Sequence, residues 1–407
     1  YSKVTYVSNI TDIDDKIIKA SIESGEPIDL ITKKYEKIYN EDMASLGVLK
    51  PDAQPHATDF IKEMIELIEK MIKNDTAYAS DGHVLFDVTK YSAYGKLSGR
   101  NIEDQLAGSR VEVASYKKNP GDFVLWKPSV DNQPGWDSPW GFGRPGWHLE
   151  CSTMSEQTLG LPFDIHGGGM DLTFPHHENE IAQSCGAHGE DKDPSIFVRY
   201  WIHNAMLNID GEKMSKSLGN IFYIRDYLKN HDGEVLRLAL LSGHYRQSIN
   251  WSAETMEQSK SILDRLYRIL NKVEDIKVED QDLAECPEKV LLALCDDLNT
   301  SKALAELNDI SKKLSTSNND SDKLKYKIEL LSAAKVFGIL NQSPKKWLGI
   351  GQIQDNLDSD FIEKLIQQRT EARLAKDFNK ADEIRNTLSD MGVEIEDTPD
   401  GTTWRMK

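Results

Sequence analysis

This 407-residue sequence has few cysteines, no long apolar run and fewer basic than acidic residues. Its four cysteines are too few and too scattered for a disulfide framework, so we expect a reducing, cytoplasmic setting. No run of about eighteen apolar residues is present, so we expect no membrane span and no membrane partner. The formal charge of −18 argues against a protein that coats nucleic acid through bulk electrostatics, although local basic patches could still contact RNA.

We expect no signal peptide in the residues after Tyr1, because they contain no charged segment followed by an apolar one. The first residue is not methionine, so we expect that upstream sequence is missing. The length and the hydrophobic content of 39% predict about two to four domains with cores of their own.

The first third of the chain alternates between strand and helix patterns. Val4 to Ile10 predicts a short buried strand, and the acidic residues after it predict a helix that begins near Lys16. Residues 59–73 have the apolar spacing of an amphipathic helix. Short β-rich runs between Ala77 and Trp126 predict an insertion within an α/β domain.

The pattern after Trp251 is helical to about Leu340. The final sixty or so residues then predict a separate small unit. We expect helices over 360–376 and 379–390, and a strand at 393–395 paired with 402–404.

A lysine-rich loop is the most informative short segment. Lys213, Met214, Ser215 and Lys216 place two ammonium groups three residues apart, which suits a polyphosphate whose charge reorganises during reaction. A solvated surface turn would have the same composition, and this short segment alone does not exclude one.

Six of the ten histidines lie between residues 148 and 203. On a helix that starts after Pro175, His176 and Glu180 project from the same face. With Cys151 alongside, they form a zinc-compatible set of thiolate, imidazole and carboxylate. The alternative is a polar helix N-terminus beside a buried structural cysteine.

Three glycines follow the strand expected at 163–165. Gly167, Gly168 and Gly169 would allow close approach of a nucleotide, and Asp171 could accept hydrogen bonds from ribose hydroxyls. An ordinary strand-to-helix turn is the alternative.

Near the C-terminus, four basic residues recur at spacings of four, three and four, which places them on one helix face: Arg369, Arg373, Lys376 and Lys380. Either a solvated face or a surface for RNA fits this pattern.

Together these segments resemble the cysteinyl-tRNA synthetases. The resemblance is carried by residues 9–16 (Asn-Ile-Thr-Asp-Ile-Asp-Asp-Lys), 146–152 (Gly-Trp-His-Leu-Glu-Cys-Ser), 164–180, 211–220 and the pattern from Arg369 to Arg385. It covers the whole chain and is least specific over 80–140 and 275–360.

The resemblance implies a fold of the α/β class, namely a Rossmann-type class I synthetase core with an inserted connective domain. A stem-contact segment, a helical bundle and a small anticodon-binding domain would follow. The expected boundaries are 1–62 and 137–200 for the core, 63–136 for the insertion, 201–255 for the stem-contact segment with the Lys-Met-Ser-Lys-Ser loop, 256–348 for the bundle and 349–407 for the C-terminal domain.

It also implies ATP-dependent ligation of L-cysteine to tRNA(Cys) through a cysteinyl-adenylate, by a monomer. One Zn²⁺ per chain would be held by Cys151, His176 and Glu180 and completed by the substrate thiolate. A thiophilic cation can reject serine, whereas an apolar pocket cannot separate S from O by orders of magnitude. Thr11, Trp147 and His166 would form the amino-acid pocket.

For the other substrates, the resemblance implies ATP with Mg²⁺ bound by Gly167, Gly168, Gly169, Asp171 and the loop Lys213, Met214, Ser215 and Lys216. Lys213 and Lys216 would act on the triphosphate. Arg369, Arg373 and Lys376 would contact the tRNA, where Trp404 could stack on a base. Trp404 as core filler is the alternative.

One departure from the family pattern concerns the beginning of the chain. A His-Ile-Gly-His type motif and a further zinc-binding cysteine are expected near the N-terminus of the family, and neither is in these 407 residues. As written, the chain would lack half of the ATP site and one ligand, which we attribute to the missing upstream sequence.

Two alternative functions stay open. One is a cysteine ligase of the mycothiol-pathway type that acts on a small amine, against which the anticodon-like C-terminal block argues. The other is a noncatalytic RNA-binding paralogue, against which the lysine loop and the zinc set argue.

Overall fold

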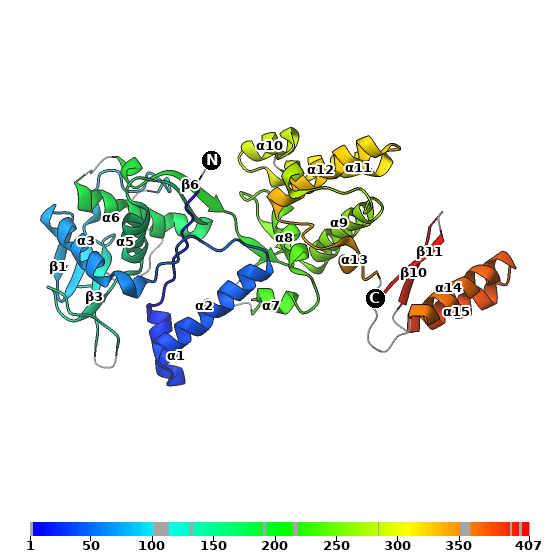
Figure 1. The fold of residues 1–407 in the computed structure, drawn as a ribbon. Coiled ribbons are helices and arrows are strands. Elements are labelled where there is room, and N and C mark those ends of the chain that lie inside the picture. Colours follow the sequence, from blue (N-terminus) through cyan, green and yellow to red (C-terminus); the bar gives the residue numbers. More distant parts are fainter. Residues whose placement is uncertain are drawn as a thin grey trace. The chain divides into compact units, whose positions relative to one another are not determined.

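The structure is a computed structural model that describes residues 3–100, 114–130, 133–189, 193–214, 219–283, 285–350, 359–390, 393–398 and 401–406. It divides into two compact units (Figure 1): Tyr1–Asn208, Lys213–Gly219 and Tyr245–Ile249 make the first, and Ile209–Glu212, Asn220–His244 and Asn250–Lys407 the second. Within the described residues, no helix has the length and apolarity needed to cross a bilayer.

The first unit begins with three helices, α1 (Asp15–Ser24), α2 (Ile28–Ser45) and α3 (Ile61–Lys73), the last preceded by the 3₁₀ turn η1 (Ala57–Phe60). Asp14 caps α1, because its side chain accepts a hydrogen bond of 2.6 Å from the backbone N–H of Ile17. The expected acidic cap and the amphipathic helix at 59–73 are therefore confirmed.

The buried strand expected at Val4 to Ile10 is wrong. This segment makes only two isolated parallel bridges, Val7 with Ala53 and Ile10 with His56, and Val4 is 70% exposed. The apolar pattern is that of a strand, but a continuous ladder also needs backbone partners along its length.

The β-rich insertion is confirmed as an antiparallel sheet of order β1-β2-β3-β4. Its strands are β1 (Ala77–Ser80), β2 (His83–Phe86), β3 (Phe123–Pro128) and β4 (Gly143–Pro145), with the short 3₁₀ turn η2 (Val88–Lys90) after β2. Asp122 is 1% exposed and accepts hydrogen bonds from the Tyr78 hydroxyl (2.6 Å) and the Val88 N–H (3.2 Å). This buried carboxylate connects the loop before β3 to β1 and to the turn η2.

The remaining part of the first unit contains α5 (Trp147–Leu159), α6 (Glu178–His188) and the parallel strands β5 (Phe163–Gly169) and β6 (Val198–Asn204). Three short turns complete it: η3 (Met170–Leu172), the π-helical η4 (Thr173–His177) and η5 (Pro194–Ile196). The strand expected at 163–165 runs on through Gly169, so the three glycines lie within the strand rather than after it. The register pairs Gly168 with His203.

After β6, strands β7 (Leu207–Ile209), β8 (Glu212–Lys213) and β9 (Ile249–Trp251) form a small sheet of order β8-β7-β9. Up to residue 350, the rest of the second unit consists of helices: α7 (Ile224–Tyr227), α8 (Gly233–Leu241), α9 (Ala253–Asn271), η6 (Asp280–Leu283), α10 (Glu288–Cys295), α11 (Thr300–Thr316), α12 (Asp320–Phe337) and α13 (Pro344–Trp347). The helical pattern expected between Trp251 and about Leu340 is thereby confirmed.

A single carboxylate joins three parts of this helical bundle. Glu234 on α8 is 8% exposed and accepts hydrogen bonds from the Tyr267 hydroxyl of α9 (2.9 Å) and from the N–H groups of Leu340 (2.9 Å) and Asn341 (2.8 Å). The chain that leaves α12 is thereby attached to α8 and α9.

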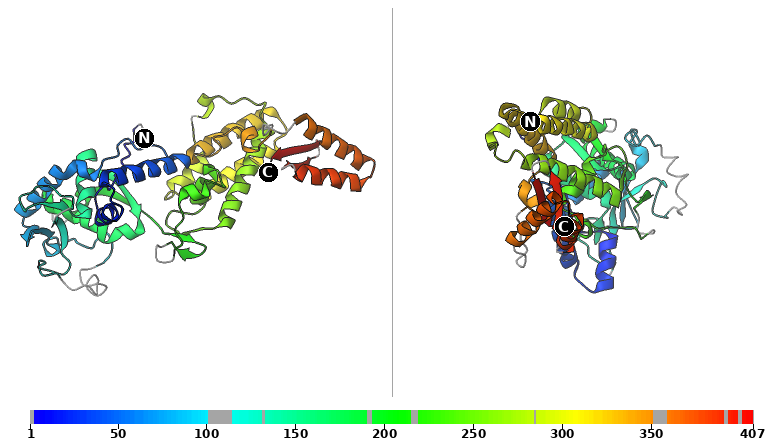
Figure 2. Two further views of the ribbon diagram at one scale, coloured as in Figure 1. Left: turned by 90° about the horizontal axis from the view of Figure 1, so that it is seen from below. Right: turned by 90° about the vertical axis from the view of Figure 1, so that its right-hand side faces the viewer.

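The C-terminal part contains α14 (Ser359–Leu374), α15 (Phe378–Asp390) and the antiparallel hairpin β10 (Val393–Thr398) with β11 (Gly401–Met406), seen from three sides in Figures 1 and 2. Its core holds Ile362, Ile384, Leu388 and Val393, and Trp404 packs against them. Both expected helices and the expected strand pairing, with Ile395 opposite Trp404, are confirmed.

Candidate active site

Helix α5 starts directly against the insertion sheet. The N–H of Gly146 donates to the Leu125 carbonyl at 2.8 Å, and a Cβ at Gly146 would lie 2.1 Å from the Val124 carbonyl oxygen. Only glycine fits this approach, so the first turns of α5 are held beside β3. Trp147 and Cys151 are four residues apart and therefore project from one face of α5.

The π-helical turn η4 and the start of α6 bring a second pair of side chains to the same place. The distance from His176 Nε2 to Glu180 Oε1 is 3.1 Å. The donor atoms of Cys151, His176 and Glu180 all lie within 4.8 Å of one another. The three residues proposed from sequence as metal ligands therefore meet at one point.

Glu180 is the least satisfied group of this cluster. It is completely buried, and neither of its oxygens has a hydrogen-bond partner among the described residues, although His176 Nε2 and His166 Nε2 approach to 3.1 and 3.7 Å. His166 Nδ1 is likewise buried without a partner in the described part of the chain. Buried polar atoms are normally hydrogen-bonded, so these exceptions point to a ligand.

The protonation states agree with a cation site. Burial raises the pKa of the Glu180 carboxyl, but three surrounding histidines lower it by more, so the net pKa lies below the usual value. Burial, and after it the nearby Glu180 and Glu150 side chains, raise the pKa of the Cys151 thiol well above its usual value. That thiol needs a positive charge beside it in order to ionise.

Two histidines that the sequence did not single out, His148 and His177, contact other histidine rings at the cluster. Nδ1 of His148 lies 2.8 Å from Nδ1 of His176, and Nδ1 of His177 lies 2.8 Å from Nε2 of His203. Burial lowers the pKa of His148 and of His177 to about 3. Both rings are thus neutral at pH 7, and a neutral imidazole is the form that binds a metal.

His148 and His177 left weak signals in the sequence. His148 lies three residues before Cys151, and the doublet of His176 and His177 puts a second ring one position from a predicted ligand. Trp201 and His203 alternate along β6, and the His166 ring stacks on Trp201 with centroids 4.7 Å apart. Only the parallel pairing of β5 with β6 brings them together, and spacing does not give that pairing.

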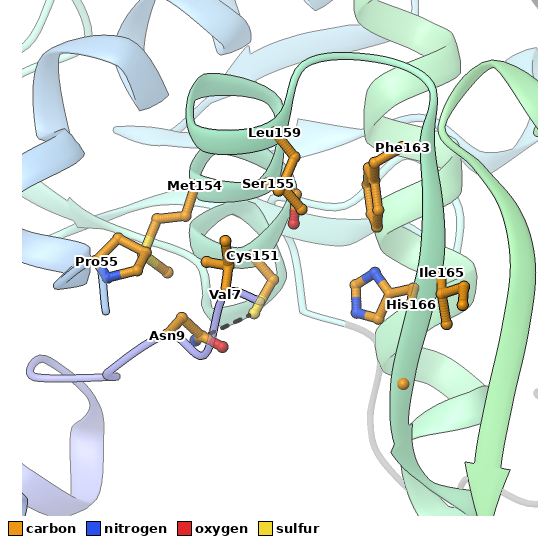
Figure 3. A pocket seen from close by; sticks show the side chains of 11 residues that line it. Val7, Asn9, Pro55, Cys151, Met154, Ser155, Leu159, Phe163, Ile165 and His166 are labelled. Atoms are coloured by element: carbon orange, nitrogen blue, oxygen red, sulfur yellow. Dashed lines mark hydrogen bonds between the residues drawn. The ribbon is translucent and has the colours of Figure 1, made fainter. Parts of the chain in front are cut away.

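A cavity of about 120 Å³ lies beside the cluster and is lined by Asn9, Cys151 and His166, among others (Figure 3). The Asn9 side chain donates a hydrogen bond of 3.7 Å to the Cys151 sulfur. Trp147 is 50% exposed, and its ring centroid lies 4.3 Å from that of His176. The space is suited to a small molecule beside the thiol.

Thr11, expected in the amino-acid pocket, forms a hydrogen bond with Glu150. Glu150 is 1% exposed, and its Oε2 has no hydrogen-bond partner in the described residues. Burial and the nearby Asp12 and Asp14 raise its pKa to about 9, against the hydrogen bond from Thr11. Glu150 is therefore a neutral acid at pH 7, a state that the sequence did not indicate.

The residues proposed for ATP differ in what the structure says of them. A Cβ at Gly168 would lie 2.7 Å from Cε1 of His177, so this glycine has a packing reason of its own. The Asp171 side chain lies over Gly169, since a Cβ there would meet Asp171 Oδ1 at 2.5 Å. Lys213 ends β8 with an exposed side chain, Met214 follows it, and Ser215 and Lys216 lie outside the described residues.

The basic residues near the C-terminus also separate into two kinds. Arg369 is 7% exposed and forms two hydrogen bonds with Asp397, of 2.8 and 2.9 Å. Arg373 and Lys376 are exposed, although Arg373 also reaches Asp397 at 2.5 Å. Trp404 is half-buried against the small core.

Three family models match the chain. One described as the catalytic domain of tRNA synthetases class I (C) matches residues 1–261, a DALR domain matches 289–341, and a cysteinyl-tRNA ligase anticodon-binding domain matches 359–405.

Whole proteins similar to this chain are cysteine–tRNA ligases. The chain is 52% identical over 406 residues to the cysteine–tRNA ligase of Parvibaculum lavamentivorans, a match that covers 100% of this chain and 86% of that protein. The cysteine–tRNA ligase of Rhodospirillum rubrum is also 52% identical over 406 residues, with 100% and 87% covered. Among solved structures, methionyl-tRNA synthetase from Mycobacterium tuberculosis in complex with methionyl-adenylate has a TM-score of 0.58 at 16% identity, over 87% of each chain, which shows a shared fold.

Proposed function

The chain belongs to the cysteine–tRNA ligases, class I synthetases that charge tRNA with cysteine, and from that premise we propose that Cys151, His176 and Glu180 hold a zinc ion that selects the amino acid. The observation that carries the proposal is the buried Glu180 carboxylate, which has no hydrogen-bond partner among the described residues. One thiol, one imidazole and one carboxylate within 4.8 Å fit zinc, and three protein ligands leave room for a substrate group.

Selection by this site rests on the difference between sulfur and oxygen. When bound, zinc would supply a thiophilic cation that favours the thiolate of cysteine over the hydroxyl of serine. Around it, His148 keeps the His176 ring oriented through the contact between their Nδ1 atoms, and the half-exposed Trp147 covers the substrate side chain. Asn9 orients the Cys151 sulfur.

For the activation step, we propose that the cysteine carboxylate attacks the α-phosphate of ATP, with Mg²⁺, to give a cysteinyl-adenylate and pyrophosphate. No protein nucleophile is needed, so catalysis is positioning and charge stabilisation. Lys213 and Lys216 would neutralise the triphosphate, and Asp171 would hold the ribose. Gly167 and Gly169 would let the nucleotide approach the backbone of β5; a Cβ at Gly167 would meet only the Ile202 carbonyl oxygen, at 3.7 Å, whereas Gly169 is covered by the Asp171 side chain and Gly168 serves the packing of His177.

At the C-terminal end, the exposed Arg373 and Lys376 are the better candidates for contact with the tRNA backbone. Arg369 would act through Asp397, because its guanidinium is buried in that pair. Trp404 would offer the exposed part of its ring. The domain boundaries, the monomeric state and the cytoplasmic setting stay predictions.

The test of the metal site is the zinc content of the purified chain, together with the visible spectrum of its cobalt-substituted form. We expect one zinc per chain and a thiolate-to-cobalt band that changes when cysteine is added but not when serine is added. Absence of bound metal, or an equal response to both amino acids, would contradict the assignment.

The lysine loop has a separate test in the variant Lys216→Ala. Cysteinyl-adenylate formation should slow far more than cysteine binding weakens, because the ammonium acts on the triphosphate. Equal losses in both steps would point to a structural role instead.

The two alternatives have less support. A ligase for a small amine does not account for the match of an anticodon-binding model to residues 359–405. A noncatalytic paralogue does not account for an intact donor cluster within a class I catalytic domain.

A further inference from the structure

A turn of the insertion holds the segment that carries two of the proposed ligands. The backbone N–H groups of Gly95 and Ser98 donate to the two carboxylate oxygens of Glu178, at 2.8 and 3.0 Å. The Tyr94 hydroxyl donates to Oδ1 of Asn179 at 2.5 Å. We call residues 94–100 the clamp turn.

The clamp turn makes a further contact with the π-helical turn. The guanidinium carbon of Arg100 lies 5.1 Å from the centroid of the Phe174 ring, two residues before His176. Contacts of the clamp turn thus flank His176 on one side and touch the two residues that directly precede Glu180.

Burial and backbone conformation both indicate that these contacts are specific features of the fold. Glu178 and Asn179 are 1% and 2% exposed, so their hydrogen bonds form away from water, where losing a partner is costly. Gly95 has φ of +92°, a conformation that other residues rarely adopt, and this conformation directs its N–H toward the carboxylate. The glycine at position 95, its backbone conformation and the burial of Glu178 and Asn179 therefore all favour contact between the clamp turn and the first turn of α6.

From this geometry we propose that Tyr94 and Glu178 are positioning residues of the cysteine-binding site, through which the insertion fixes the orientation of His176 and Glu180. The inference rests on the proposed zinc site. It deepens that site by naming outer contacts that the clamp turn, a different part of the sequence, makes with the segment that carries the ligands.

The physical reason lies in the strict geometry of metal ligands. His176 lies in the irregular turn η4, in which Phe174 has non-helical φ and ψ of −142° and 129°, and Glu180 lies in the first turn of α6 directly after it. Such an irregular turn has no regular ladder to set its rotation, so external contacts decide where the ligands point. Outer partners of metal ligands typically change metal affinity about 10- to 100-fold when removed.

The test uses the full chain and the variants Tyr94→Phe and Glu178→Gln. Tyr94→Phe removes one hydroxyl, and Glu178→Gln faces one backbone N–H with a second donor. The zinc dissociation constant, measured by competition with a chelator, should rise about 10-fold in each. The cobalt-substituted form should show altered band intensities, and KM should rise for cysteine but not for ATP.

A matched control acts on the other end of the same helix. The Asn74 side chain donates to the carbonyls of Gly186 (3.0 Å) and Ala187 (2.9 Å) near the end of α6. Asn74→Ala should lower the thermal midpoint by an amount similar to Glu178→Gln and leave the zinc dissociation constant unchanged.

Each outcome decides between readings. If wild-type chain binds zinc and both clamp variants bind it equally well, the positioning role is overturned and the zinc site stands. If Asn74→Ala weakens zinc as much as they do, helix stability alone explains the effect and the inference also fails. If wild-type chain binds no zinc, the metal site and this inference fall together.

Discussion

Two buried polar clusters in this chain differ in how their charges are paired. In the first unit, the completely buried Glu180 has two oxygens without a hydrogen-bond partner among the described residues. In the C-terminal part, the buried Arg369 has a bidentate partner in Asp397. A buried charge that its own chain satisfies is explained by structure, whereas one left unsatisfied asks for a ligand. The comparison thus separates two sets of residues that looked equally functional in the sequence.

The largest expected effect comes from removing a donor at the unsatisfied cluster. His176→Ala should lose zinc and reduce kcat/KM for cysteine activation by more than the roughly 10- to 100-fold typical of an outer partner. Metal analysis and cysteine-dependent pyrophosphate exchange measure the two losses. A variant with full zinc and normal rejection of serine would remove the distinction between the clusters.

A smaller effect, on stability rather than on activity, is expected at the pair of Arg369 and Asp397. Arg369→Ala should destabilise the α14, α15 and hairpin region by about 1–3 kcal/mol, because a buried hydrogen-bonded pair is broken while Asp397 regains water. Hydrogen exchange of α14 and β10 amides measures this loss. Zinc content and cysteine activation should not change, and a drop in either would contradict the assignment.

The pairing also predicts a dependence on pH. Hydrogen bonds from Arg369 hold the pKa of Asp397 well below its usual value. The pair therefore contributes stability above the unfolded pKa of about 4, and this contribution is lost as pH falls further. The protection that separates wild type from Asp397→Asn should shrink between pH 7 and pH 3, and a constant gap would show that the charge is not what matters.

The smallest effect on stability belongs to Arg373→Ala. The Arg373 side chain is 48% exposed, and such pairs typically contribute about 0–1 kcal/mol. Amide protection in α14 should barely change, while the KM for tRNA should rise, as measured in charging assays. A rise in KM for Arg369→Lys but not for Arg373→Ala would reverse the roles of the two arginines.

Sequence patterns predicted the elements whose structure depends mainly on residues close to one another in the chain. The helices at 360–376 and 379–390 follow from apolar spacing, and the pairing of 393–395 with 402–404 follows from two short strands joined by a turn. The helical spacing of His176 and Glu180 and the resemblance together supplied Cys151, His176 and Glu180 as a set, and the fold brings their donor atoms together.

What could not be predicted depends on contacts distant in sequence. The segment at Val4 to Ile10 has a strand pattern but only two bridges, because pairing is a property of its neighbours. The burial that neutralises Glu150 and the contact of Glu178 with Gly95, 83 positions away, have no periodic signal. The pairing of Arg369 with Asp397, 28 positions away, likewise has no periodic signal in the sequence.

The carboxylate of Glu234 has a consequence for the order in which the chain folds. Its partner Tyr267 is 33 positions away, but its partner Leu340 is 106 positions away. Closing the longer loop costs more chain entropy and takes longer, so the contact with α9 can form early, while the contacts beyond α12 wait for the whole bundle. During synthesis, Glu234 would therefore hold only its bond to Tyr267 until the 73 residues from there to Leu340 have emerged.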